Sequence, residues 1–148
     1  MTGGQQTDLA QAQQAVMVDM QVATTELRAV LDAEREALDQ ADSIALDAAT
    51  SVKAQLLQRL ESLDAERRQF EELAPAPGAC LEVWRHVCRQ LEECRRINET
   101  NGNIVTRQLS HVRRALGILR GSGEAPSVLY GRGGEARAPA IQHSLSRA

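Results

Sequence analysis

Four side chains that can bind a metal lie close together in the sequence, namely Cys80, His86, Cys88 and Cys94. A zinc site needs closely spaced pairs of ligands, or ligands that meet on one face of a helix. Successive helical residues are about 100° apart, so Cys88 and Cys94 point about 120° apart and cannot share a metal. Glu82 and His86 could contribute to a two-metal bundle only with a matching pair on another helix, and no histidine precedes His86. We therefore predict no metal site and interpret the cysteines as small buried hydrophobic side chains.

Groups for nucleophilic or phosphate chemistry are equally sparse. His86, His111 and His143 have no serine or cysteine partner in a recognised catalytic signature. The run from Gly131 to Gly134 lacks the Lys-Ser/Thr of a phosphate-binding loop and does not stand between a strand and a helix, so it is interpreted as a solvated turn. The sequence therefore predicts a protein that is not an enzyme and uses no cofactor.

The composition is typical of long helices rather than of sheets. Of the 148 residues, 43% are hydrophobic and 2% aromatic, and the four prolines leave long stretches without a helix breaker. This length suits one domain with a modest core. No apolar run is long enough to span a membrane, no secretory leader is evident, and three cysteines do not suggest a disulfide framework. We expect a cytoplasmic protein without membrane insertion.

The net charge of −3 conceals an asymmetry between the two halves of the chain. Residues 1–74 carry a net charge of −8, and residues 75–148 carry +5. We interpret this difference as attraction between antiparallel helices. Nucleic-acid binding by the basic half is less favoured, because its arginines alternate with glutamates and Tyr130 is its one aromatic residue beyond Trp84. We expect no nucleic-acid partner.

A regular apolar stripe predicts the first helix. It begins near Asp8. Residues 1–7 contain two glycines and are expected to be a disordered terminus, and the first six residues resemble the start of a phage-derived epitope tag. The chain is expected to reverse within residues 39–47, where Asp42 and Ser43 are candidate N-caps. The stripe has spacings of seven and four residues and consists of Leu9, Val16, Met20, Leu27, Leu31 and Leu38.

The second helix ends at residues 74–78, where two prolines and a glycine stop it. A third helix follows and contains the polar segment Asn98–Gly102. The sequence leaves open whether this helix continues through that segment or bends near Asn101–Gly102. Together the elements predict an all-α fold, an elongated antiparallel three-helix bundle over residues 8–120. Residues 121–148, rich in Gly, Ala, Ser, Arg and Pro, are predicted to form a flexible, disordered tail.

After the polar segment, the third helix has a wide apolar face bordered by arginines. Such a face can accept an amphipathic helix from another protein. It can equally be covered inside the bundle or in a homodimer, and periodicity alone does not separate these alternatives. The candidate binding residues are Ile104, Val105, Leu109, Val112, Leu116 and Leu119.

A resemblance to a known family rests on a set of segments within residues 27–135. They occur in this order: Ala33–Leu38, Lys53–Glu61, Glu66–Arg68, Trp84, Asn98–Gly102, Ala115–Leu119 and Leu129–Gly133. As an ordered set they resemble the FlgN family of flagellar type III export chaperones. The resemblance says little about the chain after Gly134.

The resemblance implies a cytoplasmic, ATP-independent chaperone for the hook–filament junction proteins FlgK and FlgL. It would hold their terminal helices and deliver them to the export apparatus. The apolar face of the third helix would receive the client helix. Tyr130 matches a tail tyrosine that, in such chaperones, docks on the cytoplasmic domain of the export gate protein FlhA. The alternative function is a homodimeric coiled-coil structural adaptor with no client.

Overall fold

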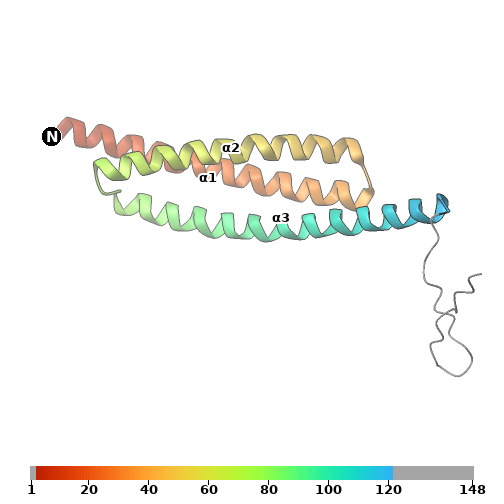
Figure 1. The fold of residues 1–148 in the computed structure, drawn as a ribbon. Coiled ribbons are helices and arrows are strands. Elements are labelled where there is room, and N and C mark those ends of the chain that lie inside the picture. The colour runs from red at the N-terminus through yellow and green to blue at the C-terminus, as the bar shows by residue number, and fades with distance from the viewer. Residues whose placement is uncertain (1–2, 122–148) are drawn as a thin grey trace, which may run out of the picture. The chain divides into compact units, whose positions relative to one another are not determined.

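Long runs without helix breakers form three helices in the computed structural model, which describes residues 3–121. They are α1 (Gly3–Gln40), α2 (Ser43–Leu73) and α3 (Gly78–Leu119), and no strand occurs in this part of the chain (Figure 1). The chain divides into two compact units, Met1–Leu109 and Ser110–Ala148. The fold class predicted from the sequence, an all-α antiparallel three-helix bundle, is confirmed.

Within the first unit, two short connections reverse the chain, so neighbouring helices are antiparallel. The helix α1 alone has 38 residues, which corresponds to about 57 Å at the usual rise of an α-helix. The polar segment Asn98–Gly102 does not interrupt α3, which continues through it as one helix. A Cβ atom placed on Gly102 would meet nothing within 4 Å, so no close backbone approach requires the glycine.

The start of α1 differs from the prediction. The helix begins at Gly3 rather than near Asp8, so Gly3–Thr7 belongs to α1 instead of forming a disordered terminus. The hydroxyl of Thr7 donates a hydrogen bond to the carbonyl of Gly3 at 3.0 Å, which supports this first turn. From residue 5 onward no glycine or proline occurs before the end of α1, so nothing in the segment breaks the helix.

The reversal between α1 and α2 takes only two residues and lies inside the predicted range. Ala41 has a positive φ of 54°, and the N–H of Asp42 donates to the carbonyl of Ala37 at 2.9 Å, as in a Schellman-type helix end. The carboxylate of Asp42 then caps α2 by accepting from the N–H groups of Ile44 and Ala45 at 3.1 and 3.0 Å. Asp42 is therefore the N-cap.

This turn predicts that Ala41→Gly stabilises the protein. An L-residue in the left-handed region is strained by about 1–2 kcal/mol, and glycine is not. We expect the free energy of unfolding to rise by about 1 kcal/mol, measured by urea unfolding followed by circular dichroism. The matched control is Ala48→Gly at an exposed position inside α2, which should lower it by about 1 kcal/mol. If both substitutions raised the free energy of unfolding, or both lowered it, the interpretation of the turn would be contradicted.

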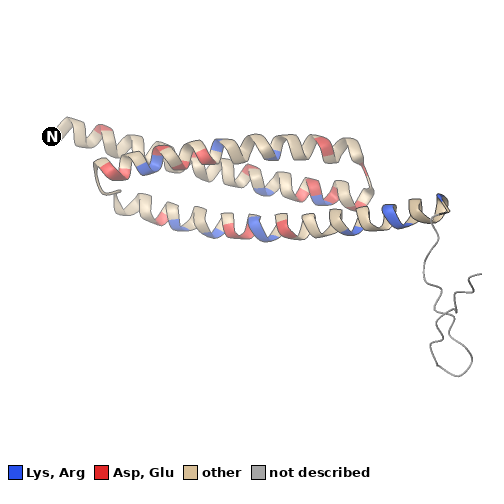
Figure 2. Ribbon diagram, viewed as in Figure 1, with Lys and Arg blue, Asp and Glu red and all other residues tan. Residues whose placement is uncertain are grey.

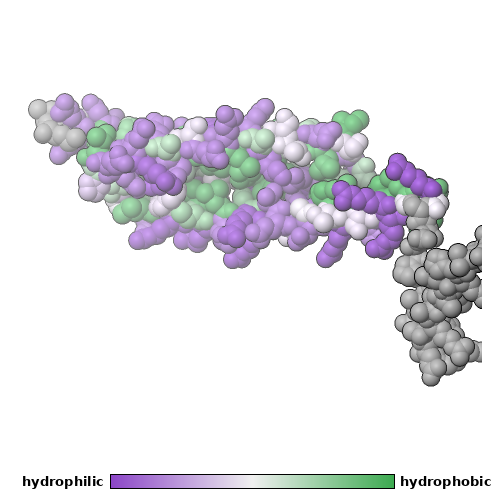
Figure 3. Space-filling model, viewed as in Figure 1, coloured by the Kyte–Doolittle hydropathy of each residue, from purple (hydrophilic) through white to green (hydrophobic). Residues whose placement is uncertain are grey.

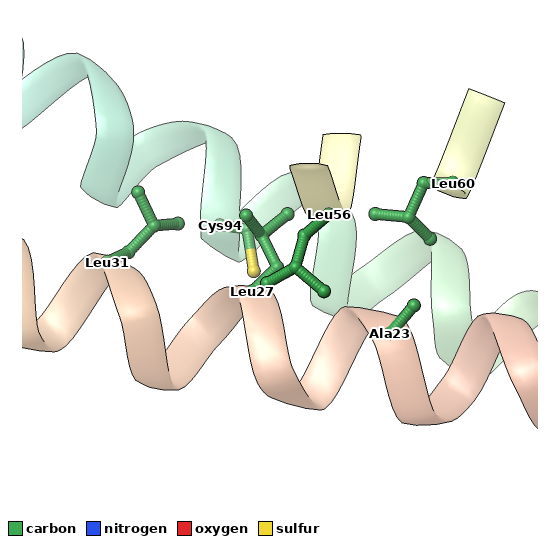
Figure 4. Close-up of a cluster of buried hydrophobic side chains, with 6 residues drawn as sticks. All are labelled: Ala23, Leu27, Leu31, Leu56, Leu60 and Cys94. Atoms are coloured by element: carbon green, nitrogen blue, oxygen red, sulfur yellow. The ribbon is translucent and has the colours of Figure 1, made fainter. Parts of the chain in front are cut away.

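The core forms where the three apolar stripes meet. One cluster joins α1, α2 and α3, and a second joins Val16 and Met20 of α1 to Val87 of α3. In the space-filling view, hydrophobic side chains gather between rows of hydrophilic ones (Figure 3). Of the stripe predicted for α1, the five residues from Val16 to Leu38 are buried. Figure 4 shows the first cluster, Ala23, Leu27, Leu31, Leu56, Leu60 and Cys94.

Two polar side chains join the helices at the end of the bundle where α2 connects to α3. The buried amide of Gln13 in α1 donates to the carbonyls of Phe70 and Ala74 at 3.4 and 3.0 Å, which satisfies acceptors at the end of α2. Arg67 of α2 places its guanidinium 3.9 Å from the ring centroid of Trp84 in α3. This cation–π contact joins α2 to α3 close to the connection between them.

Candidate helix-docking surface

The polar segment of α3 is built into the core through Asn101, which is 1% exposed. Its amide nitrogen donates to the carbonyl of Leu31 at 3.0 Å and to the carboxylate of Glu34 at 2.8 Å. Its amide oxygen accepts from Nε of Arg35 at 2.8 Å. The hydrogen-bonding capacity of this side chain is thus directed at α1, and Asn101 occupies a buried position of α3.

The same network reaches α2 through Lys53. Its ammonium contacts the carboxylate of Glu34 at 2.5 Å and donates to the amide oxygen of Asn98 at 3.1 Å. Glu34 is buried and accepts from both Lys53 and Asn101, so its charge is paired. The network therefore ties all three helices together at one level and fixes where α3 lies along α1.

The cysteines do not behave as one set. Cys80 and Cys94 are buried, as predicted, whereas Cys88 is exposed, so its predicted burial is wrong. The reason is angular, because Cys88 lies about 120° around α3 from Cys94 and faces solvent. Burial raises the pKa of the Cys94 thiol. Among residues 3–121, no group of three His, Cys, Asp or Glu side chains is placed to hold a metal ion.

The first part of the predicted docking face belongs to the first unit. Ile104 and Val105 are half-buried, and Leu109 is exposed. Between them, the amide of Gln108 donates to the carbonyl of Leu38 in the last turn of α1 at 3.1 Å. Within residues 3–121 no later residue of α3 bonds to α1, so the part of α3 up to residue 108 is held by the bundle.

The remaining predicted residues lie in the second unit, where α3 continues to Leu119. Val112, Leu116 and Leu119 are 54%, 44% and 81% exposed. They repeat at spacings of four and three residues and therefore share one face of this helical segment. An apolar face with this exposure is a surface that another helix can cover.

The apolar period of α3 is buried in the first unit and exposed in the second. Cys94 and Val112 are eighteen residues apart, which is about five helical turns, so both belong to the same apolar period of the sequence. Cys94 is 3% exposed in the bundle, whereas Val112 is mostly accessible. Among the described residues, this apolar period is thus covered in the first unit and uncovered in the second.

The first unit has a groove between α2 and α3 that was not apparent from the sequence. The groove holds about 210 Å³, and Leu57 at its rim is exposed. Leu57 follows the buried Leu56 directly, and only the packing of α2 against α3 distinguishes the two. The residues that line the groove are Leu27, Leu31, Lys53, Leu57, Leu91, Cys94, Arg95 and Asn98.

Tyr130, predicted to bind the export gate, lies outside the described residues, as does the chain from residue 122 onward. No helix in the described part has an apolar stretch sufficient to cross a lipid bilayer. What the described residues define is an all-helical bundle protein with an uncovered apolar face on its longest helix, an arrangement suited to binding another helix.

The comparison with known families gives this class a name. The sequence family described as FlgN protein matches residues 9–138, which is most of the chain, and the chain therefore belongs to the FlgN family. The family has the general role of a flagellar export chaperone. No significant match was found among curated proteins or solved structures.

Proposed function

We propose that this protein is a cytoplasmic, ATP-independent chaperone that binds the terminal helices of the junction proteins FlgK and FlgL and delivers them to the export gate. The observation that carries the proposal is the uncovered apolar face of α3, with Val112, Leu116 and Leu119 exposed at helical spacing. Membership of the FlgN family supplies the class of client. A client helix would cover the face and remove both apolar surfaces from water.

The bundle supports this role by holding α3 in place up to Gln108. Asn101 and its partners Glu34 and Lys53 fix the helix in register, and Gln108 bonds to the end of α1. A helix that is already formed loses little conformational entropy when a client binds. Capture of the client then requires ordering of the client segment alone.

Isothermal titration of the full chain against a FlgK-type carboxy-terminal helical segment tests the proposal. We expect saturable one-to-one binding with a negative heat-capacity change, because apolar surface is buried. A folded sample that gives no heat and no shift of the tryptophan emission at high concentration would instead support the adaptor. The mass in solution at several concentrations then identifies the homodimer.

Delivery to the export gate predicts a separate effect of Tyr130→Ala. We expect the affinity for the cytoplasmic domain of FlhA to fall about tenfold or more, because tyrosines are frequent energetic centres of interfaces. Client affinity should not change, since the proposed client face is on α3. Tyr130→Phe is the control that separates the ring from the hydroxyl. An unchanged gate affinity of Tyr130→Ala, with normal client binding, would show that Tyr130 has no such role.

A further inference from the structure

The arginines at the end of α3 are not used within the described structure. Residues 100–121 contain four arginines, at 107, 113, 114 and 120, and no aspartate or glutamate. None of the four forms a salt bridge within residues 3–121, whereas Arg28, Arg59 and Arg67 of the bundle each contact a carboxylate. In Figure 2 the corresponding end of α3 carries blue but no red segments.

Ion pairs between α3 and the other helices also leave this positive charge unneutralised within the described residues. One salt bridge in the described residues joins α3 to another helix, between Arg28 of α1 and Glu93 of α3 at 2.6 Å. Its arginine comes from the acidic half of the chain and its glutamate from the basic half. Attraction between antiparallel helices therefore stays a prediction for the charge asymmetry, and the arginines at the end of α3 remain available to a partner.

Two of these arginines border the apolar face of the second unit. Arg113 lies about 60° around the helix from Leu116, and Arg120 lies about 40° from it. The N–H of Arg120 donates to the carbonyl of Leu116 at 3.0 Å, so the helical pattern continues to this residue. Arg114, in contrast, lies about 160° from Val112 on the opposite side of the helix.

We propose that the helix which docks on Val112, Leu116 and Leu119 carries aspartate or glutamate beside its apolar stripe, placed to pair with Arg113 and Arg120. This inference rests on the proposed function and names the chemistry of its client. The same charges disfavour a second copy of this chain as the occupant. If two copies paired through this face, their arginines would repel each other, because neither segment contains an aspartate or glutamate to compensate them.

The test uses the full chain and two synthetic amphipathic peptides with one leucine stripe. The residues that flank the stripe are glutamates in one peptide and lysines in the other. Dissociation constants are measured at about 50 mM and about 300 mM salt, because screening reduces surface charge interactions. We expect the glutamate peptide to bind at least about tenfold more tightly at low salt, with a smaller difference at high salt.

Charge reversal at the border supplies the specific control. Arg113→Glu with Arg120→Glu should reverse the preference, so that the lysine peptide binds more tightly. Arg114→Glu makes half of this charge change on the opposite side of the helix and should leave the preference for the glutamate peptide in place. All three positions are exposed, and circular dichroism confirms that the variants are folded.

Other outcomes separate this inference from the proposed function. Equal affinities for both peptides, abolished by Leu116→Asp, would overturn the charge preference and leave the docking face intact. Binding of neither peptide would overturn both the face and its charge preference. A dimer of the free chain that dissociates in Leu116→Asp would assign the face to a second copy and overturn the inference.

Discussion

Replacing Leu109 and Leu116 together by aspartate is expected to weaken binding of the FlgK-type segment by at least about a hundredfold while the protein stays folded. Each leucine covered by a client contributes roughly 1.5–3 kcal/mol, and a buried aspartate would add a desolvation penalty. Both leucines are exposed in the free protein, so the substitutions remove no core contact. Isothermal titration measures the affinity, and the circular-dichroism signal at the helix band measures the fold.

The matched control for this double variant is Val52→Asp. Val52 lies on α2 and is 44% exposed, the same value as Leu116. The change has the same chemical character but lies on another helix, so client affinity should not change. If the double variant loses its helical signal, these leucines belong to the core and the docking face has to be sought elsewhere, with the groove beside Leu57 as the next candidate.

Asn101→Ala should produce the largest change in stability of any single substitution proposed for this chain. It removes the partner of the Glu34 carboxylate, of the Leu31 carbonyl and of Nε of Arg35. Buried groups without a partner cost about 1–3 kcal/mol each, and Glu34 keeps its ion pair with Lys53. We expect the free energy of unfolding to fall by about 3 kcal/mol, measured by urea unfolding.

Asn103→Ala provides the comparison for Asn101→Ala. Asn103 belongs to the same stretch of α3, is exposed, and its side chain forms no hydrogen bond within residues 3–121. Its replacement should change the free energy of unfolding by less than about 0.5 kcal/mol. Similar effects of the two substitutions would mean that the network around Asn101 does not hold α3 in register.

The helices themselves could be predicted because their signals are local. Spacings of three, four and seven residues marked the faces of α1 and α3, and the prolines at 75 and 77 marked the end of α2. Asp42 was recognisable as a cap because short acceptor side chains compete for free N–H groups at a helix start. The start of α1 was misplaced because two glycines suggested disorder, although residues 5–40 contain no breaker.

The tertiary features could not be predicted because they depend on how far one helix is shifted along another. Nothing local to Lys53 shows that its ammonium meets Glu34 and Asn98. For the same reason Leu57 could not be distinguished from its buried neighbour Leu56. The candidate face could be predicted from the sequence, because an apolar period continues past Gln108. Gln108 is the last described residue of α3 that bonds to α1. The binding role of the face stays a prediction.

The position of Lys53 has a practical consequence for labelling the protein. It is the only lysine in the chain, and its ammonium is engaged on two sides by Glu34 and Asn98. Amine-directed cross-linkers and dyes therefore find one side-chain amine, and reaction there would disconnect α2 from the network. The exposed thiol of Cys88 is a better attachment point, because it faces away from the core while Cys80 and Cys94 are buried. A fluorophore on Cys88 would leave the arginine-bordered face of α3 unmodified while client binding is followed.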